Sequence, residues 1–437
     1  MRAGRNTEQG HDVHSLVISL LRRNGDFRAV FLAQIVSFCG DWFATVAMLG
    51  LVIDRTDSDL ATAAVFVVQM LPGFLLSPFA GPAADRFDRR KLMIGVSLLQ
   101  AASAGLFLAA VHGPVAFAFL AQGLISGLGA FFLPASQAAL PNLVDGEDLK
   151  LATVMISSTW GAMLAVGAAV GGAFTVAFGR DASFVADGAS FLVAAALIIS
   201  IRRPTHEVGA ERPRGRMRPA ADTVETFRYA RTNPLVAALL SSKLGFGLGS
   251  GTMAMLPLLA SGPFHSGDSG TGILLGARGL GVVIGPFIAN VLITRRTGRS
   301  ALHGILLVCG TAGLVYAAGY VVVGVAPVLL IAALGALLAH LGGGAQWALS
   351  TYGLQSAVPD YIRGRVFAAD FALVTVSMSL SLLASGALAE VTGPRLPTLL
   401  LAGVGALWSA VYLTLTRPLR RQYAGAGEAV SSAASRS

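Results

Sequence analysis

Long apolar stretches recur along almost the whole chain, separated by short polar segments. Each stretch is about twenty residues long, which is the length that a helix needs to cross the hydrocarbon core of a bilayer. Because lipid offers the backbone no hydrogen-bond partner, each stretch is predicted to be a helix. The predicted spans cover residues 29–53, 61–80, 92–111, 115–139, 151–178, 182–201, 235–258, 270–293, 301–323, 326–349, 366–389 and 398–416.

A polar segment with eight arginines, residues 202–234, divides these spans into two sets of six. The two sets are weakly similar, since an offset of 209 residues places Arg86 on Arg295 and Arg90 on Arg299. An internal repeat of this kind predicts two similar bundles side by side. The predicted organisation is an arm (1–28), a six-helix bundle (29–201), a linker (202–234), a second six-helix bundle (235–416) and a tail (417–437).

All but five of the 32 Lys and Arg residues lie on one side of the predicted membrane. By the positive-inside rule, this side and both termini are predicted to be cytoplasmic, in a multi-pass protein of the cytoplasmic (inner) membrane. The net charge of +9 then reflects topology and contact with anionic lipid headgroups. Nucleic-acid binding is not expected, because these charges are dispersed rather than gathered on one folded face.

The arm contains arginines but no cleavable apolar core, so a removed signal peptide is not expected. Its apolar residues between Val13 and Leu21 repeat at helical spacing, which predicts an amphipathic helix on the inner membrane surface. The two cysteines, Cys39 and Cys309, both fall within apolar spans, and a disulfide framework is therefore not expected.

The loop after the second span carries the strongest motif in the chain, GPAADRFDRRK over residues 81–91. It resembles the loop signature of the major facilitator superfamily, Gly-x-x-x-Asp-Arg-x-Gly-Arg-Arg-Lys/Arg, with Asp at position 88 where the family usually has Gly. Residues 34–48 and 354–368 resemble the branch of that superfamily that contains drug, macrolide and siderophore exporters. The resemblance implies an all-α membrane protein with twelve helices in two pseudo-symmetric six-helix bundles, the major facilitator fold.

In proteins with this signature the loop acts as a latch on the cytoplasmic side. The resemblance implies that Asp85 faces the amino-terminal end of span eleven, where the helix dipole favours negative charge, while the arginines engage carboxylates or helix-end carbonyls. The alternative is that the loop only enforces topology. Because topology needs positive charge alone, the alternation of Asp with Arg favours the latch. The predicted cytoplasmic gate consists of Gly81, Asp85, Arg86, Arg89, Arg90 and, one turn inside span eleven, Asp370.

Ionisable residues inside the spans are candidates for a substrate or proton site, since a charge at mid-bilayer costs about 2.5–3.5 kcal/mol even on a lenient scale. By helical rise, Asp41 and Arg278 lie ~18 Å deep, Lys243 and His340 lie roughly 9–12 Å from the cytoplasmic edge, and Asp187 lies near a span end. The predicted site consists of Gln34, Asp41, Lys243, Arg278 and His340.

Spans one, four, seven and ten line the central cavity in this superfamily, so the resemblance implies that Asp41 and Lys243 face the pathway. Asp41 is then predicted to bind a proton or a cationic substrate group, with protonation changing the favoured state. The alternative is a structural ion pair of Asp41 with Arg278 or Lys243 that carries no cargo. His340 could titrate near neutral pH, but donation to a neighbouring carbonyl is favoured.

Span five contains small residues at Gly161, Gly167 and Gly171, which favour close packing between the halves. It partly resembles the antiporter signature of drug exporters, with Gly172 where that signature has Pro. The glycine-rich stretch at 245–251 follows no strand, so it does not predict a dinucleotide site. Phosphate-loop and zinc motifs are absent, and therefore no cofactor or metal is expected and an ion gradient is the predicted energy source.

Together these features predict a non-enzymatic permease, monomeric in the lipid bilayer, that exports amphipathic or hydrophobic small molecules coupled to protons or another ion. Import or uniport of a metabolite is one alternative. A sensor or scaffold on the same fold, without transport, is another, because a fold does not determine an activity.

Overall fold

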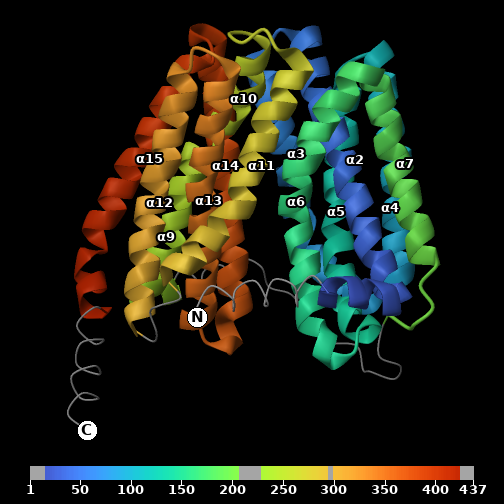
Figure 1. Ribbon diagram of the computed structural model, residues 1–437, viewed down its shortest axis with the longest axis horizontal. Coiled ribbons are helices and arrows are strands. Elements are labelled where there is room, and N and C mark those ends of the chain that lie inside the picture. The colour runs from blue at the N-terminus through green and yellow to red at the C-terminus, as the bar shows by residue number, and fades with distance from the viewer. Residues whose placement is uncertain (1–14, 206–227, 294–298, 424–437) are drawn as a thin grey trace.

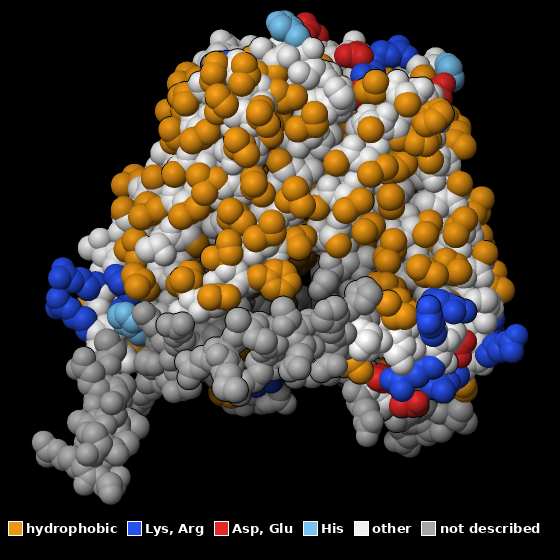
Figure 2. Space-filling view, viewed as in Figure 1, with side chains coloured by type: hydrophobic (Ala, Val, Ile, Leu, Met, Phe, Trp, Pro, Cys, Tyr) orange, Lys and Arg blue, Asp and Glu red, His pale blue; other side chains and the backbone are white. Residues whose placement is uncertain are grey.

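The computed structural model describes residues 15–205, 228–293 and 299–423. The chain is helical in these ranges, without strands, and twelve segments are long and apolar enough to cross a membrane. These observations confirm the predicted all-α fold with twelve spans. Figure 2 shows hydrophobic side chains over the middle of the visible face and charged side chains gathered towards its two ends.

The first half contains six spans that run alternately up and down (Figure 1). Asn24 and Ser58 cap the starts of the first two spans, accepting hydrogen bonds from Phe27 N and Ala61 N. The helices are α2 (Gly25–Thr56), α3 (Asp59–Arg86), α4 (Arg89–His112), α5 (Ala116–Leu143), α6 (Gly146–Phe178) and α7 (Arg180–Ile199). A short helix over 15–23 precedes them, and its Leu20 is fully buried.

The second half repeats this arrangement with one difference in its first span. The helices are α9 (Pro234–Gly249), α10 (Thr252–Ser261), α11 (Gly267–Ile293), α12 (Arg299–Val325), α13 (Leu329–Ala357), α14 (Asp360–Thr392) and α15 (Arg395–Leu415). Span seven was predicted as one helix but is broken at Ser250–Gly251 into α9 and α10.

Two serines of α14 explain the break in span seven. Ser381 Oγ accepts a hydrogen bond from Gly251 N at 3.0 Å, and Ser385 Oγ donates to Gly251 O at 3.0 Å. These contacts satisfy backbone groups that an unbroken helix would satisfy internally. The glycine-rich stretch also allows close packing, since a Cβ at Gly251 would meet the backbone of Ser381. The stretch therefore shapes the break in this span.

The two ends of the molecule differ in how closely the halves approach. We call the end where α2 begins and α15 ends the basic end, and the opposite end the far end. One cluster of buried hydrophobic residues joins both halves towards the far end, with members such as Leu49 of α2, Leu275 of α11 and Leu382 of α14. Towards the basic end, each half has its own separate cluster. Figure 2 shows the surface hollowed between the halves, just above the grey atoms at the basic end.

Candidate functional site

Lys243 and Asp370 form a buried ion pair within the second half. Lys243 Nζ, on α9, donates to Asp370 Oδ2 on α14 and to Thr351 Oγ1 on α13 at 3.0 Å. The ammonium group also lies 4.7 Å from the centroid of the Trp347 ring, which is a cation–π distance. Only 2% of the Lys243 side chain and 6% of the Asp370 side chain are exposed. The pair neutralises two charges that would each be costly alone.

This pair corrects two expectations about partners. Asp370 was placed one turn inside span eleven, beside the loop arginines, but α14 begins at Asp360, so Asp370 lies about 15 Å along the helix. Lys243 is neutralised by Asp370, which leaves no ion pair between Lys243 and Asp41. Asp370 Oδ1 is buried and has no hydrogen-bond partner.

Asp41 of α2 and Asp187 of α7 form an acidic pair in the first half. Asp187 is fully buried and neither of its carboxyl oxygens has a hydrogen-bond partner. Asp41 is half-buried, and the two carboxyl groups are close enough to interact electrostatically. Gly40 makes room for this contact, because a Cβ there would lie 2.9 Å from Asp187 Oδ1. Within the described ranges, no basic side chain forms an ion pair with either group.

The acidic pair differs from the sequence interpretation in two respects. Asp187 was placed near a span end, but it lies about 10 Å along α7, in the helix interior. The proposed structural ion pair of Asp41 with Arg278 or Lys243 does not occur in this structure. The choice between a proton site and a site for a cationic substrate group remains a prediction.

Arg278 of α11 lies among aromatic residues of the second half. It interacts electrostatically with Tyr316 and Tyr320 of α12 and with His340 of α13. His340 was expected to donate a hydrogen bond to a neighbouring carbonyl, but its Nε2 lies 3.0 Å from the Tyr320 hydroxyl. Because α13 continues to Ala357, His340 lies about 25 Å from the basic end, deeper than predicted.

Gln34 lies apart from these charges. It is 3% exposed, its Nε2 donates to Ile156 O of α6 at 3.4 Å, and its Oε1 is buried without a partner. The structure therefore does not bring Gln34 into one cluster with Lys243, Arg278 and His340.

The loop over 81–91 holds the first half together at the basic end. Arg89 Nη1 donates to Ala138 O at 2.8 Å and to Thr205 O at 3.0 Å, and Arg90 donates to Ile198 O and Ile199 O. Asp88 caps α4 by accepting from Lys91 N at 2.9 Å. These carbonyls all belong to the first half, and Arg86 is exposed. The side chains at Gly81 and Asp85 lie outside the described residues, so the latch role of this loop stays a prediction.

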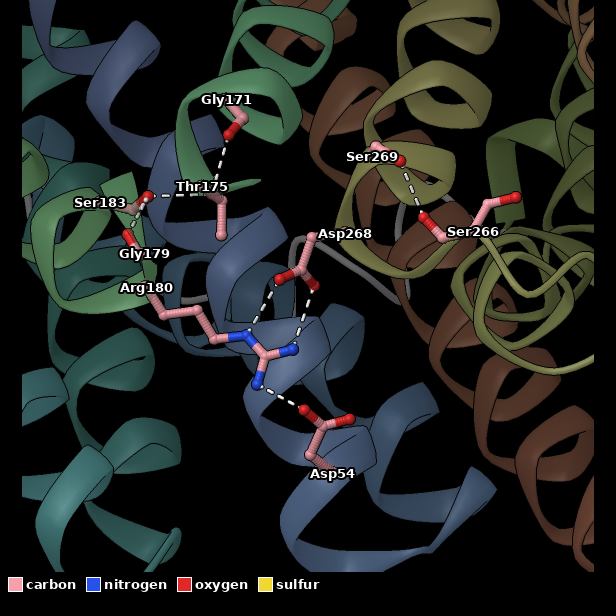
Figure 3. A network of polar contacts seen from close by, with 9 residues as sticks. All are labelled: Asp54, Gly171, Thr175, Gly179, Arg180, Ser183, Ser266, Asp268 and Ser269. Carbon is pink, nitrogen blue, oxygen red and sulfur yellow. Dashed lines mark hydrogen bonds and ion pairs between the residues drawn. The ribbon is translucent and has the colours of Figure 1, made fainter. Parts of the chain in front are cut away.

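The far end carries an ion-pair network that joins the two halves (Figure 3). Arg180, at the start of α7, donates through Nε and Nη2 to both oxygens of Asp268 on α11, at 3.1 and 3.3 Å. Its Nη1 donates to Asp54 Oδ2 of α2 at 2.7 Å. Gly50 allows this geometry, because a Cβ there would occupy the space of the Asp268 and Arg180 side chains. We call Asp54, Arg180 and Asp268 the far-end gate.

A second polar contact crosses between the halves at the far end. Glu390, near the end of α14, accepts hydrogen bonds from the Ser58 hydroxyl and from Leu60 N at 3.1 Å. It therefore helps to cap the start of α3 in the other half. The sequence interpretation missed both contacts. The available signal was that Arg180 is one of only three basic residues predicted on that side of the membrane.

Glycines allow close backbone contacts between the halves, and a Cβ at Gly279 of α11 would lie 2.4 Å from Ala165 Cα of α6. A Cβ at Gly172 of α6 would lie 2.9 Å from Gly272 Cα of α11, and a Cβ at Gly272 would lie 2.8 Å from Gly172 Cα. Of the three glycines predicted to pack between the halves, only Gly161 faces the second half, near Val282 and Val283. Gly167 and Gly171 instead face Trp42 and Phe43 of α2 in their own half, because they lie on another face of α6.

The two halves meet through α6 with α11 and through α3 with α14, and ionisable residues are buried between the helix ends. This arrangement is typical of membrane transporters. Residues 19–433 match the family described as transmembrane secretion effector, of the MFS (major facilitator superfamily) type. The match covers most of the chain, and the protein belongs to this family of transporters.

Curated relatives agree with this assignment. An uncharacterized MFS-type transporter of Mycobacterium tuberculosis is 32% identical over 415 residues, covering 89% of each chain. The multidrug efflux pump Tap of Mycolicibacterium fortuitum is 26% identical and aligns with 91% of this chain and 98% of its own. The enterobactin exporter EntS of Citrobacter koseri is 27% identical over 91% of this chain and 89% of its own.

Solved structures agree on the fold alone. A POT family transporter in complex with a thioalcohol-conjugated peptide superposes with a TM-score of 0.72 at 10% identity, covering 90% of this chain and 96% of its own.

Proposed function

We propose that the protein exports amphipathic or hydrophobic small molecules by alternating access and that proton uptake drives the export. The names of two full-length relatives, a multidrug efflux pump and an enterobactin exporter, support the direction of transport. The far-end contacts of this structure support a cycle in which one end closes while the other opens.

The observation that carries the proton coupling is the acidic pair of Asp41 and Asp187. Two carboxylates this close, without a basic partner among the described residues, repel each other strongly if both are charged. A charge in a membrane span is also costly. The pair therefore holds at least one proton when it is closed off from water. Asp41 is the member that keeps exposed surface, so it exchanges that proton with the cavity.

The two ends of the molecule would act as alternate gates. The far-end gate is closed here, and each half has a separate hydrophobic cluster at the basic end. In the opposite state, the loop over 81–91 would meet α14, as its resemblance to the superfamily signature implies.

In the proposed topology, the basic end faces the cytoplasm, both termini are cytoplasmic, and the protein works as a monomer in the inner membrane. Reporter domains fused to the carboxyl terminus test the orientation. A reporter active only in the cytoplasm should function there, and activity of a periplasmic reporter at the same position would contradict it.

Growth of an efflux-deficient host on a chemically diverse toxin panel tests the function. Wild type should raise tolerance to at least some compounds severalfold. Asp41→Asn should lose this gain while reaching the membrane at normal levels. Asp181→Asn, which removes an exposed acid at the start of α7, is the matched control and should retain it. Full tolerance with Asp41→Asn would contradict the coupling role, and no tolerance with any compound would contradict export.

A further inference from the structure

Arg278 is a buried cation for which the described part of the chain offers no anion. Its side chain is 8% exposed, and its Nε is buried without a hydrogen-bond partner. No described residue forms an ion pair or a hydrogen bond with the guanidinium group. A buried charge without a partner is strongly unfavourable. The missing negative charge therefore has to come from outside the described residues or from a different state of the protein.

The groups around Arg278 are suited to bind an anion. Tyr316, Tyr320 and His340 act on it electrostatically, and no carboxylate is among the groups that do. His340 Nδ1 is buried without a partner, while its Nε2 lies 3.0 Å from the Tyr320 hydroxyl. If the hydroxyl donates to Nε2, Nδ1 carries a proton that is free to donate. Arginine itself offers a planar fork of N–H groups that matches a carboxylate.

The other charges in the pathway do not supply this anion. Lys243 and Asp370 neutralise each other, so Arg278 is the one charge among the buried, described residues of the second-half spans that is not balanced. Asp41 and Asp187 lie on α2 and α7 of the first half, where Asp187 packs against Gly40. Neither acid bonds Arg278 in this structure.

Aromatic rings connect Arg278 with the ion pair of Lys243. Tyr316 lies 5.4 Å from the His340 ring and 5.2 Å from the Phe246 ring, and Phe246 lies 6.0 Å from Trp347. Trp347 is 39% exposed, so this row of rings ends at an accessible surface. Aromatic side chains stack on aromatic ligands and favour them over aliphatic ones.

We propose that Arg278 binds the carboxylate of an aromatic organic anion, with donors from Tyr316 and His340 and with the row of rings from Tyr316 to Trp347 holding its aromatic body. That this anion is the exported cargo rests on the proposed function. A small inorganic anion such as chloride could supply the same negative charge, and the experiment separates the two sources.

Three matched probes test the site by isothermal titration calorimetry on the purified full-length protein in lipid nanodiscs, in low-salt buffer. The probes are 1-naphthoate, its neutral amide and 1-naphthylmethylammonium, which share one ring system and differ in charge. Wild type should bind the carboxylate at least tenfold more tightly than either of the others. Arg278→Gln should abolish this preference and Arg278→Lys should keep part of it. Arg55→Gln, at the far end of α2, is the arginine control and should keep all of it.

The preference is a ratio measured within one variant, so it does not depend on how much of that variant is folded. Equal binding of the three probes to wild type would overturn the proposal, and so would an unchanged preference in Arg278→Gln. If chloride alone raised the melting temperature through Arg278 and wild type showed no preference for naphthoate, the site would be one for an inorganic anion and the cargo claim would be wrong. Toxin export that is unaffected by Arg278→Gln would remove the inference and leave the proposed function standing. Charge-selective binding without any export would contradict the proposed function and leave the anion site at Arg278 standing.

Discussion

Arg180 and Asp268 join the two halves of the molecule through a bidentate ion pair at the far end. The guanidinium group approaches both carboxylate oxygens, at 3.1 and 3.3 Å, and only 25% and 14% of the two side chains are exposed. A bidentate pair of this kind is geometrically specific. It forms only when α7 and α11 are in contact, so the pair reports that the far end is closed.

Asp268→Asn should shift the protein towards a state that is open at the far end. Losing a charge-assisted hydrogen bond costs about 1.5–3 kcal/mol, which corresponds to roughly tenfold or more in the ratio of closed to open states. Spin labels at positions 181 and 263, with Cys39 and Cys309 replaced, would show a larger population of long distances. Asp54→Asn is the matched control, because it removes a contact of Arg180 within the first half and should have a much smaller effect. An unchanged distance distribution in Asp268→Asn would contradict the role of this pair.

Gly172→Ala should disturb the same closure sterically. The new Cβ would lie 2.9 Å from both Asp268 O and Gly272 Cα, which are backbone atoms that cannot rotate away. Overpacking of this kind costs about 1–3 kcal/mol, so the melting temperature should fall or the far end should open. Gly105→Ala on α4 is the control, because no atom lies within 4 Å of the added Cβ. Wild-type stability and distances in Gly172→Ala would show that the crossing is looser than described.

Lys243 and Asp370 should behave as a buried ion pair in a double-mutant cycle. Removing one partner leaves a buried charge and costs about 3–5 kcal/mol, so Lys243→Met and Asp370→Leu should each lower the melting temperature sharply. The double variant should recover most of the loss, because an apolar pair avoids the desolvation penalty. Additive losses in the double variant would show that the two side chains act independently.

Asp187→Asn should be tolerated much better than Lys243→Met. If the buried carboxyl of Asp187 carries a proton, an amide of the same shape replaces a neutral group and leaves no charge unpaired. The melting temperature should change by no more than a few degrees, and the variant should keep its fold. A loss as large as that of Lys243→Met would indicate that Asp187 is charged and paired in the native state.

The sequence predicted the twelve spans, their division into sixes and the residues that carry charge within them. These features follow from local hydropathy, which each segment displays by itself. Partners could not be predicted in the same way. Lys243 pairs with Asp370 rather than Asp41 because α9, α13 and α14 converge in space. The two paired residues are 127 positions apart in sequence. The break at Gly251 likewise depends on serines of α14.

The glycines of α6 show the same limit. Small residues predict close helix packing but do not say which neighbour is close, because rotation of the helix decides this. Gly167 and Gly171 face α2, whereas Gly172, one residue later, faces α11. Asp187 was placed nearer to a span end than it lies, because the span was predicted to begin at residue 182 whereas α7 begins at Arg180.

Proton binding at Asp41 is expected to change which end of the protein is open. Two pairs of spin labels measure this directly, one at positions 181 and 263 at the far end and one at positions 87 and 356 at the basic end. Lowering the pH in nanodiscs should change the two distance distributions in opposite senses, with one end opening in the same fraction of molecules in which the other closes. Asp41→Asn should remove this pH dependence at both label pairs. Distances that do not respond to pH, or that increase or decrease together at both ends, would contradict proton-coupled alternating access.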